Sequence, residues 1–196
     1  LKNEYAVTDP GVTLECVPSS ADRAVSPERT AVLLRALAVL PHGVEAMDTD
    51  FPGLVQTSLN MGVVRLDGAG LHVTFSIRSS IASRKEMLAQ RVRAAAALAG
   101  GTVTERGVYP GWQYRRDSEF RETLLAAYKD LTGKDGVVEA THGGLECGLF
   151  MEKLPGLDAV SLGPDIPDIQ SVRERLGVSS VARTYALVCE VLRRSV

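Results

Sequence analysis

The segment VQTSLNMGVVRLDGAGLHVTFSI, residues 55–77, decides the fold class of this chain, because it has the pattern of a β-hairpin. Residues 55–66 form the first arm, residues 71–77 form the second, and Asp67-Gly68-Ala69-Gly70 supplies glycines for the turn. Apolar and polar residues alternate along the second arm, which predicts a sheet with one buried and one solvated face. The buried face carries Leu71, Val73, Phe75 and Ile77, and the solvated face carries His72, Thr74, Ser76 and Arg78.

The sequence on either side of the hairpin predicts helices that cover its buried face. Ser26-Pro27 has the N-cap pattern of a helix that ends before Pro41. Ser83-Arg84-Lys85-Glu86 has the capping-box pattern of a second helix, which ends at Gly100-Gly101. Residues 12–17 and 102–108 are predicted as further strands. The whole order predicts an α+β fold, in which an antiparallel sheet has helices on one face.

The segment Tyr109-Pro110-Gly111-Trp112 interrupts this pattern and predicts a boundary between two domains, residues 1–112 and 113–196. Beyond it, helices alternate with short apolar strands at 137–140 and 159–162, which is typical of part of an α/β domain. This half has few strands, so we expect it to need more chain to complete its sheet. Its helices are predicted from Ser118 to Gly133, to about Lys153, and along the stripe of Val181, Tyr185, Val188 and Leu192.

The composition excludes several classes of function. A net charge of −2 and a pI of about 6.0 give no basic field for nucleic acid or an anionic membrane. No apolar run approaches the roughly 20 residues that span a bilayer. The cysteines, Cys16, Cys147 and Cys189, are odd in number and far apart, which favours free thiols in a reducing compartment. We therefore expect a cytoplasmic protein.

The glycine-rich segment from His142 to Gly148 is the strongest candidate for a ligand site. Gly143 and Gly144 would let the backbone approach a ligand closely, and backbone N–H groups at a helix start can hold a carboxylate. His142 and Glu146 lie four residues apart, a spacing that would place both on one face of a helix. The intervening glycines make a regular helix there doubtful, so an ordinary tight turn remains the alternative.

Two residues of the hairpin are candidates for binding a substrate carboxylate. Arg78, at the end of the second arm, could hold one with two parallel hydrogen bonds, and Asn60 on the neighbouring arm could add an amide contact. Taken alone, the position of Arg78 favours a solvated arginine at a strand end. Cys147 lies near His142, but nothing supplies the third group of a thiol nucleophile, so a small buried residue is favoured.

Several segments, in order along the chain, resemble one family of peptidases. They are Thr-His-Gly-Gly-Leu-Glu-Cys-Gly-Leu-Phe at 141–150, Leu1-Lys2-Asn3-Glu4-Tyr5, residues 57–64, residues 75–80, and Tyr109-Pro110-Gly111-Trp112. The pattern resembles the C-terminal portion of the aminoacyl-histidine dipeptidases, the cytosolic non-specific dipeptidases. Because the matches run almost end to end, the resemblance rests on more than one motif.

The resemblance implies a two-domain enzyme that hydrolyses small Xaa-His-type dipeptides with two zinc ions and a glutamate base. Most of its zinc ligands would lie outside these 196 residues. This chain would contribute Arg78, for the carboxylate of the substrate, and the loop at 142–148, which would line the substrate pocket. The last zinc ligand is a His in His-Ser-Pro-Asp-Glu-Arg, but this chain has Gln170-Ser171-Val172-Arg173-Glu174-Arg175 there. An amide is a poor zinc ligand, so we expect no zinc on this chain.

The resemblance therefore predicts a portion of a zinc-dependent dipeptidase that is inactive as this chain alone. A small dipeptide or another carboxylate is the expected ligand, and a homo-oligomer is the expected assembly. Two alternatives remain open. Another polypeptide could supply the missing zinc ligands, or the chain could be a non-catalytic dimerisation or binding module derived from such an enzyme.

Overall fold

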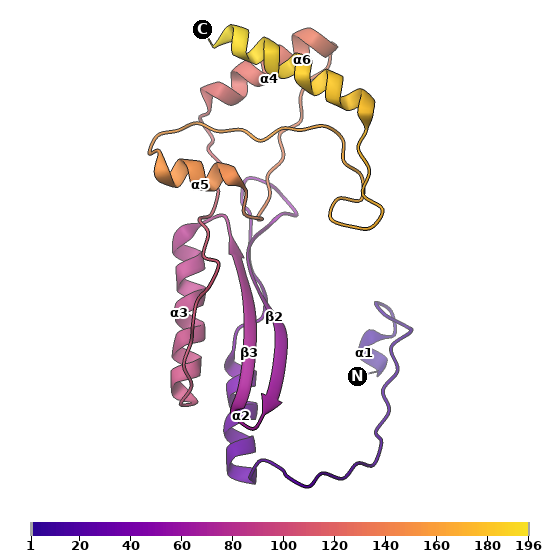
Figure 1. The fold of residues 1–196 in the computed structure, drawn as a ribbon, viewed down its shortest axis with the longest axis vertical. Coiled ribbons are helices and arrows are strands. Elements are labelled where there is room, and N and C mark those ends of the chain that lie inside the picture. Colours follow the sequence, from indigo (N-terminus) through magenta and orange to yellow (C-terminus); the bar gives the residue numbers. More distant parts are fainter. Residues whose placement is uncertain (1, 196) are drawn as a thin grey trace.

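The computed structural model describes residues 2–195, so the predictions that involve Leu1 and Val196 lie outside the described residues. Figure 1 shows a sheet with two long helices beside it, and a second group of helices beyond one end of that sheet. The elements are α1 (Lys2–Tyr5), α2 (Pro27–Val39), β1 (Gly43–Met47), β2 (Val55–Asp67), β3 (Gly70–Ser79), α3 (Ala82–Leu98), α4 (Glu119–Thr132), α5 (Glu146–Lys153) and α6 (Val178–Arg194).

The predicted hairpin is confirmed as β2 and β3. These strands pair antiparallel, and β1 joins the other edge of β2, which gives the order β1-β2-β3. The pairing register shifts between Met61 and Val63, where β2 carries an irregularity. Along β3 the expected alternation holds, because residues 71, 73, 75 and 77 are half-buried while residues 72, 74, 76 and 78 are exposed.

The core of this sheet lies between β2 and α3. Leu59 is 1% exposed and Leu88 is 0% exposed, and both belong to one apolar cluster with Val92. Leu40, Phe75 and Ile77 pack against that cluster from the sheet and from the end of α2. Helices α2 and α3 therefore stabilise the face that the sequence pattern marked as buried.

The predicted starts of the first two long helices have different outcomes. Ser26 caps α2 as expected, since its hydroxyl oxygen accepts from the Arg29 backbone N–H at 3.3 Å. The capping box at Ser83 is wrong, because α3 starts at Ala82 and the residue before it is Ile81, which has no capping side chain. The Ser79 hydroxyl oxygen accepts from the Ile81 backbone N–H at 3.0 Å, just before the helix begins.

The second core lies between α4 and α6. Ala127 of α4 packs with Leu187 and Val191 of α6, together with half-buried residues of α4. Helix α4 starts next to Ser118, close to its predicted start, and Ser118 caps it: the Ser118 hydroxyl oxygen accepts from the Arg121 backbone N–H at 3.1 Å. The predicted stripe of α6 is wrong, since the buried stripe is the neighbouring one. The residues Val181, Tyr185, Val188 and Leu192 all remain exposed, up to 71% for Tyr185.

Four predicted strands do not form within residues 2–195. The segments 12–17, 102–108, 137–140 and 159–162 all lie outside strands and helices. Figure 1 shows the first of them in a long arm that joins α1 to α2 apart from the sheet. A strand needs a neighbouring strand for its backbone hydrogen bonds, and these segments have none. The fold is therefore a three-stranded antiparallel sheet with helices, followed by helices and extended segments.

None of the helices described by the structure combines the length and the apolar character that crossing a membrane requires.

Candidate functional site

The structure places Arg78 and Asn60 on the solvated face of the sheet. Arg78 pairs with Ser58 and Asn60 pairs with Ser76, so the two are diagonal neighbours on adjacent strands. Such neighbours lie roughly 7–8 Å apart, within reach of long side chains. Within the described residues, no ion pair or hydrogen bond occupies the Arg78 guanidinium. The geometry is therefore suited to binding a carboxylate between these two side chains.

His72 shares this face but lies at the far end of the hairpin. Its Nε2 lies 3.2 Å from the Asp67 carboxylate, which also accepts from Arg65 at 2.6 Å. The backbone N–H of Ala69 is the main cause of a lowered Asp67 pKa, and the Arg65 side chain lowers it further. These contacts stabilise the turn between β2 and β3.

The segment 109–112 holds the sheet against the second group of helices. The Lys85 amine donates to the Tyr109 carbonyl and lies 4.0 Å from the centroid of the Tyr109 ring. Burial lowers the pKa of that amine. Gly111 packs directly on the end of β3: a Cβ at Gly111 would lie 2.6 Å from the Ser80 carbonyl oxygen and 2.7 Å from that of Ser79.

The glycines of the loop at 142–148 pack against this same segment. A Cβ at Gly144 would clash with the Tyr109 ring, and one at Gly148 would lie 3.2 Å from the Gly111 carbonyl oxygen. Gly143 closes a local turn, since its backbone N–H donates to the Thr141 hydroxyl at 3.1 Å. Gly144 and Gly148 therefore allow two parts of the chain to approach each other, a use of small residues that the sequence alone did not reveal.

His142 and Glu146 do not share a helix face. Helix α5 begins at Glu146, which is exposed, while His142 lies in the preceding bend and is half-buried. The contacts of Gly111 bring this loop to the same end of the sheet as Arg78, and the end of β3 points toward α5 in Figure 1. In the part of the chain that the structure describes, no hydrogen bond or ion pair joins Arg78 or Asn60 to His142 or Glu146.

Replacement of Gly111 should weaken the link between the sheet and the second group of helices. Because a Cβ at Gly111 would overlap backbone carbonyls, which cannot rotate away, we expect Gly111→Ala to lower the free energy of unfolding by about 1–3 kcal/mol. Gly163→Ala is the control, since a Cβ there meets nothing within 4 Å. Urea denaturation followed by circular dichroism compares the two. Equal stability of both variants would contradict the packing described.

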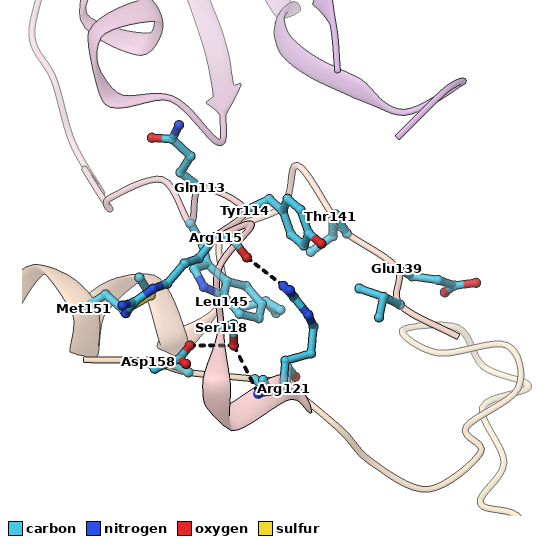
Figure 2. Close-up of a pocket in the computed structure, with 16 residues that line it drawn as sticks. Gln113, Tyr114, Arg115, Ser118, Arg121, Glu139, Thr141, Leu145, Met151 and Asp158 are labelled. Carbon is cyan, nitrogen blue, oxygen red and sulfur yellow. Dashed lines mark hydrogen bonds between the residues drawn. The ribbon is translucent and has the colours of Figure 1, made fainter. Parts of the chain in front are cut away.

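A cavity of about 230 Å³ lies next to the joint, the segment at 109–112 that connects the sheet to the second group of helices. Figure 2 shows the residues that line this cavity. Its walls come from the segment after the joint, the start of α4, the loop that leads to α5, and the segment after α5. Most of these side chains are apolar or present apolar surface to the cavity. They include Trp112, Tyr114, Val138, Leu145, Met151 and Val160.

The polar groups of the cavity hold the start of α4 in place. Asp158 accepts from the Ser118 hydroxyl at 2.8 Å and from the Phe120 backbone N–H at 3.1 Å. The Arg121 guanidinium donates to the Arg115 carbonyl at 2.6 Å and lies 5.0 Å from the centroid of the Tyr114 ring (Figure 2). Sequence reasoning missed the role of these residues, although a helix was predicted to start at Ser118.

Cys147 is only half-buried, and not buried as the sequence favoured. It is a free thiol of intermediate exposure in α5. Burial raises the pKa of this thiol, with a smaller contribution from the nearby Glu146 charge. A raised pKa leaves less thiolate near neutral pH, which is the opposite of what nucleophilic catalysis requires.

The segment of Gln170 offers few groups to a metal ion. Gln170 has a φ of +62°, and its backbone N–H donates to the Glu174 carboxylate at 2.7 Å. The Asp168 carboxylate accepts from Arg175 at 3.0 Å. Among residues 2–195, no group of three or more His, Cys, Asp or Glu side chains is placed to hold a metal ion. The donors among these described residues therefore do not by themselves fit a zinc ion.

Comparison with known proteins relates this chain to dipeptidases. No protein-family model matches it. It is 32% identical over 194 residues to cytosol non-specific dipeptidase of Escherichia coli K12, a match that covers 98% of this chain and 40% of that protein. The crystal structure of aminoacylhistidine dipeptidase from Vibrio alginolyticus superposes with a TM-score of 0.86 and 30% identity, again over 98% of this chain and 40% of the other.

A third protein shares the fold alone. Aminopeptidase PepT from Bacillus cereus superposes with a TM-score of 0.62 and 20% identity, over 83% of this chain and 44% of that one. The chain thus spans about two fifths of the length of the two dipeptidases, and it is similar to a C-terminal portion of them.

Proposed function

We propose, from this similarity to dipeptidases, that the chain is the substrate-carboxylate-binding portion of a zinc-dependent dipeptidase and has no activity alone. The observation that carries the proposal is the match to two dipeptidases over 98% of this chain. The location of Arg78 on an open, polar sheet face supports a role in binding the carboxylate of a dipeptide. Residues 1–112 would be the lid domain, and 113–196 part of the catalytic domain.

The proposal assigns different parts of the reaction to different parts of the polypeptide. Arg78 and Asn60 would bind the carboxylate of a small, Xaa-His-type dipeptide. His142, Gly143, Gly144 and Glu146 would line the substrate pocket at the same end of the sheet. The zinc ions, which would activate the attacking water, would be held mainly by the portion of the relatives that this chain does not match, with the position of Gln170 supplying one further ligand where it is His. The cytosolic name of the E. coli relative supports a cytoplasmic location.

A joined enzyme tests this assignment. It consists of the part of the E. coli relative that this chain does not match, followed by this chain with Gln170→His in place. We expect the joined enzyme to hydrolyse a dipeptide that ends in histidine, and Arg78→Ala to lower kcat/KM by roughly 100-fold, because a bidentate charged contact is lost. Kinetics with a dipeptide and with its C-terminal amide measure the effect.

The amide separates a carboxylate contact from a structural role. If Arg78 binds the carboxylate, the joined enzyme should prefer the free dipeptide to its amide, and Arg78→Ala should remove that preference. Arg65→Ala is the matched control, since Arg65 lies on the other arm near the turn and pairs with Asp67. A preference that survives Arg78→Ala would overturn the assigned role.

The exposed apolar residues of this chain favour a second candidate function. In it, the chain is a non-catalytic module for dimerisation or for binding another protein. Val44 and Met47 on the edge strand β1, and Leu34 on α2, are about half exposed or more. Such surface favours association with another chain. Light scattering that gives a monomer at all concentrations would exclude the homo-oligomeric form of this function.

A further inference from the structure

The turn between β1 and β2, residues 48–54, contacts the segment that follows the joint. The ring of Phe51 meets the ring of Tyr114 edge to face, with centroids 4.8 Å apart and planes at 85°. Next in the chain, the Asp50 carboxylate accepts from the Arg116 guanidinium at 2.8 Å. The turn belongs to the sheet, and the segment that it contacts leads into α4. These contacts therefore form a second link between the sheet and the second group of helices.

On the side of the sheet, the turn is held in shape by its own hydrogen bonds. The Asp48 carboxylate accepts from the backbone N–H of Asp50 at 2.8 Å and from that of Phe51 at 3.1 Å. The Asp48 backbone N–H donates to the Leu54 carbonyl at 2.8 Å, which closes the turn. Phe51 and Asp50 are therefore presented to the second link by a fixed backbone.

On the side of the helices, Arg121 of α4 holds the segment that the turn contacts. Its guanidinium lies 5.0 Å from the centroid of the Tyr114 ring, and it donates to the carbonyls of Arg115 and Arg116 (Figure 2). Tyr114 thus lies between two partners, Phe51 from the sheet and Arg121 from α4. A shift of the turn would therefore act on α4 through a single aromatic ring.

The second link also reaches the candidate site, because β2 follows the turn directly. The Thr57 hydroxyl of β2 lies 2.8 Å from the Ser79 hydroxyl of β3, and these residues are 1% and 3% exposed. Ser79 follows Arg78 in the chain, and its carbonyl lies against Gly111 of the joint. The position of Arg78 therefore depends both on the joint and, through β2, on the turn.

Two links restrain a motion that one link would allow. Parts of a chain that share a small interface are expected to move relative to each other. The joint provides the first link, through the contact of Lys85 with Tyr109. The turn provides the second through a different segment of each part, so rotation of the sheet about the joint is opposed.

We propose that the turn at 48–54 is a positioning element, in which Phe51, supported by Asp50, sets the orientation of Arg78 relative to the loop at 142–148. The inference rests on the proposed function, in which Arg78 binds the carboxylate of the substrate. A small displacement of a substrate-binding group lowers the rate steeply, because the reacting atoms must be held in line. Phe51 and Asp50 are thus positioning residues that act through Arg78.

The ring contact contributes more to this link than the ion pair. The Arg116 side chain is 72% exposed, and ion pairs between exposed side chains are screened by water and salt. Phe51 is half-buried, and edge-to-face ring pairs are favourable beyond the area that they bury. The largest effect is therefore expected from loss of the Phe51 ring.

Distances between spin labels measure the link without enzyme activity. The labels are attached at Ala69→Cys, in the turn between β2 and β3, and at Lys134→Cys, after α4, in a chain whose native cysteines are replaced by serine. Both positions are exposed. We expect the distance distribution to broaden in Phe51→Ala and to stay unchanged in Phe51→Tyr, which keeps the ring. Retained helical circular dichroism shows that the variants fold. An unchanged distribution in Phe51→Ala would overturn the proposal.

A charge exchange tests the contact of Asp50. Asp50→Arg places two guanidinium groups together, so we expect a smaller broadening, which the further change Arg116→Asp should reverse. Glu45→Arg is the matched control, because Glu45 of β1 pairs with Arg91 of α3 at 2.6 Å, within the sheet and its own helix. Equal broadening by Glu45→Arg and Asp50→Arg would contradict the proposal.

Kinetics of the joined enzyme separate positioning from a general loss of structure. We expect Phe51→Ala to lower the preference for a free dipeptide over its C-terminal amide by roughly 10-fold, because a displaced Arg78 meets the carboxylate poorly. Phe51→Tyr should keep the preference. A structural effect alone would slow hydrolysis of both substrates equally, and that result would overturn the proposal.

The positioning role and the proposed function can fail separately. A distribution that broadens in Phe51→Ala, with a joined enzyme that hydrolyses no dipeptide, would support the link and contradict the proposed function. Dipeptide hydrolysis with a distribution that Phe51→Ala leaves unchanged would support the function and contradict the positioning role.

Discussion

Gln170→His is expected to raise dipeptide hydrolysis by the joined enzyme by about 100-fold or more relative to the same enzyme with Gln170. Imidazole nitrogen is a strong ligand for zinc, whereas a neutral amide binds it weakly. The substitution also suits the backbone, because Gln170 has a φ of +62° and His is among the residues that adopt this region more readily. Zinc content and kcat measured on the same samples test the prediction.

Gln170→Asn is the control for this change. It retains an amide and tolerates the same left-handed backbone, so it should restore neither zinc nor activity. If Gln170→Asn raised activity as much as Gln170→His, the gain would come from the loop and not from a metal ligand. Zinc content and activity that are the same with and without Gln170→His would contradict the assignment of this position.

The second large effect is expected in the core of the sheet. Leu88 is 0% exposed and packs with Leu59 and Val92, so Leu88→Ala would leave a cavity that its neighbours fill only partly. We expect the free energy of unfolding to fall by about 2–5 kcal/mol. Urea denaturation of the purified chain, followed by circular dichroism, measures the change.

The same substitution at the end of the same helix provides the control. Leu98 is the last residue of α3 and is 87% exposed, so Leu98→Ala removes almost no buried surface. Its effect should stay within about 0.5 kcal/mol, as for other surface changes. Similar losses in both variants would mean that α3 does not cover the sheet as described.

The hairpin and the helices could be predicted because their signals are local. The alternation along β3, the turn glycines and the Ser26 cap each act within a few residues of chain. β1 escaped prediction because it has five residues and its register to β2 shifts twice, so it has no regular alternation. The buried stripe of α6 escaped as well, because two neighbouring faces of that helix are apolar and only packing against α4 selects one.

The candidate site was harder to predict, since its geometry depends on contacts between distant segments. The polar face that carries Arg78 followed from the alternation along β3, whereas the place of Asn60 on that face follows from the pairing of β2 with β3. The packing of Gly144 on Tyr109 and of Gly111 on the end of β3 joins residues far apart in the sequence, and no local pattern encodes it. The unformed strands at 137–140 and 159–162 have a similar cause, because strand pairing needs a partner segment.

The zinc content of the purified 196-residue chain tests the central claim most directly. The chain is prepared without chelator, equilibrated with a small excess of zinc, desalted and measured by atomic emission. We expect essentially no zinc per chain, because its described residues offer no group of three or more metal-binding side chains and Gln170 occupies the expected ligand position. Roughly one tightly bound zinc ion or more per chain would contradict the account, because this portion would then hold a metal site of its own.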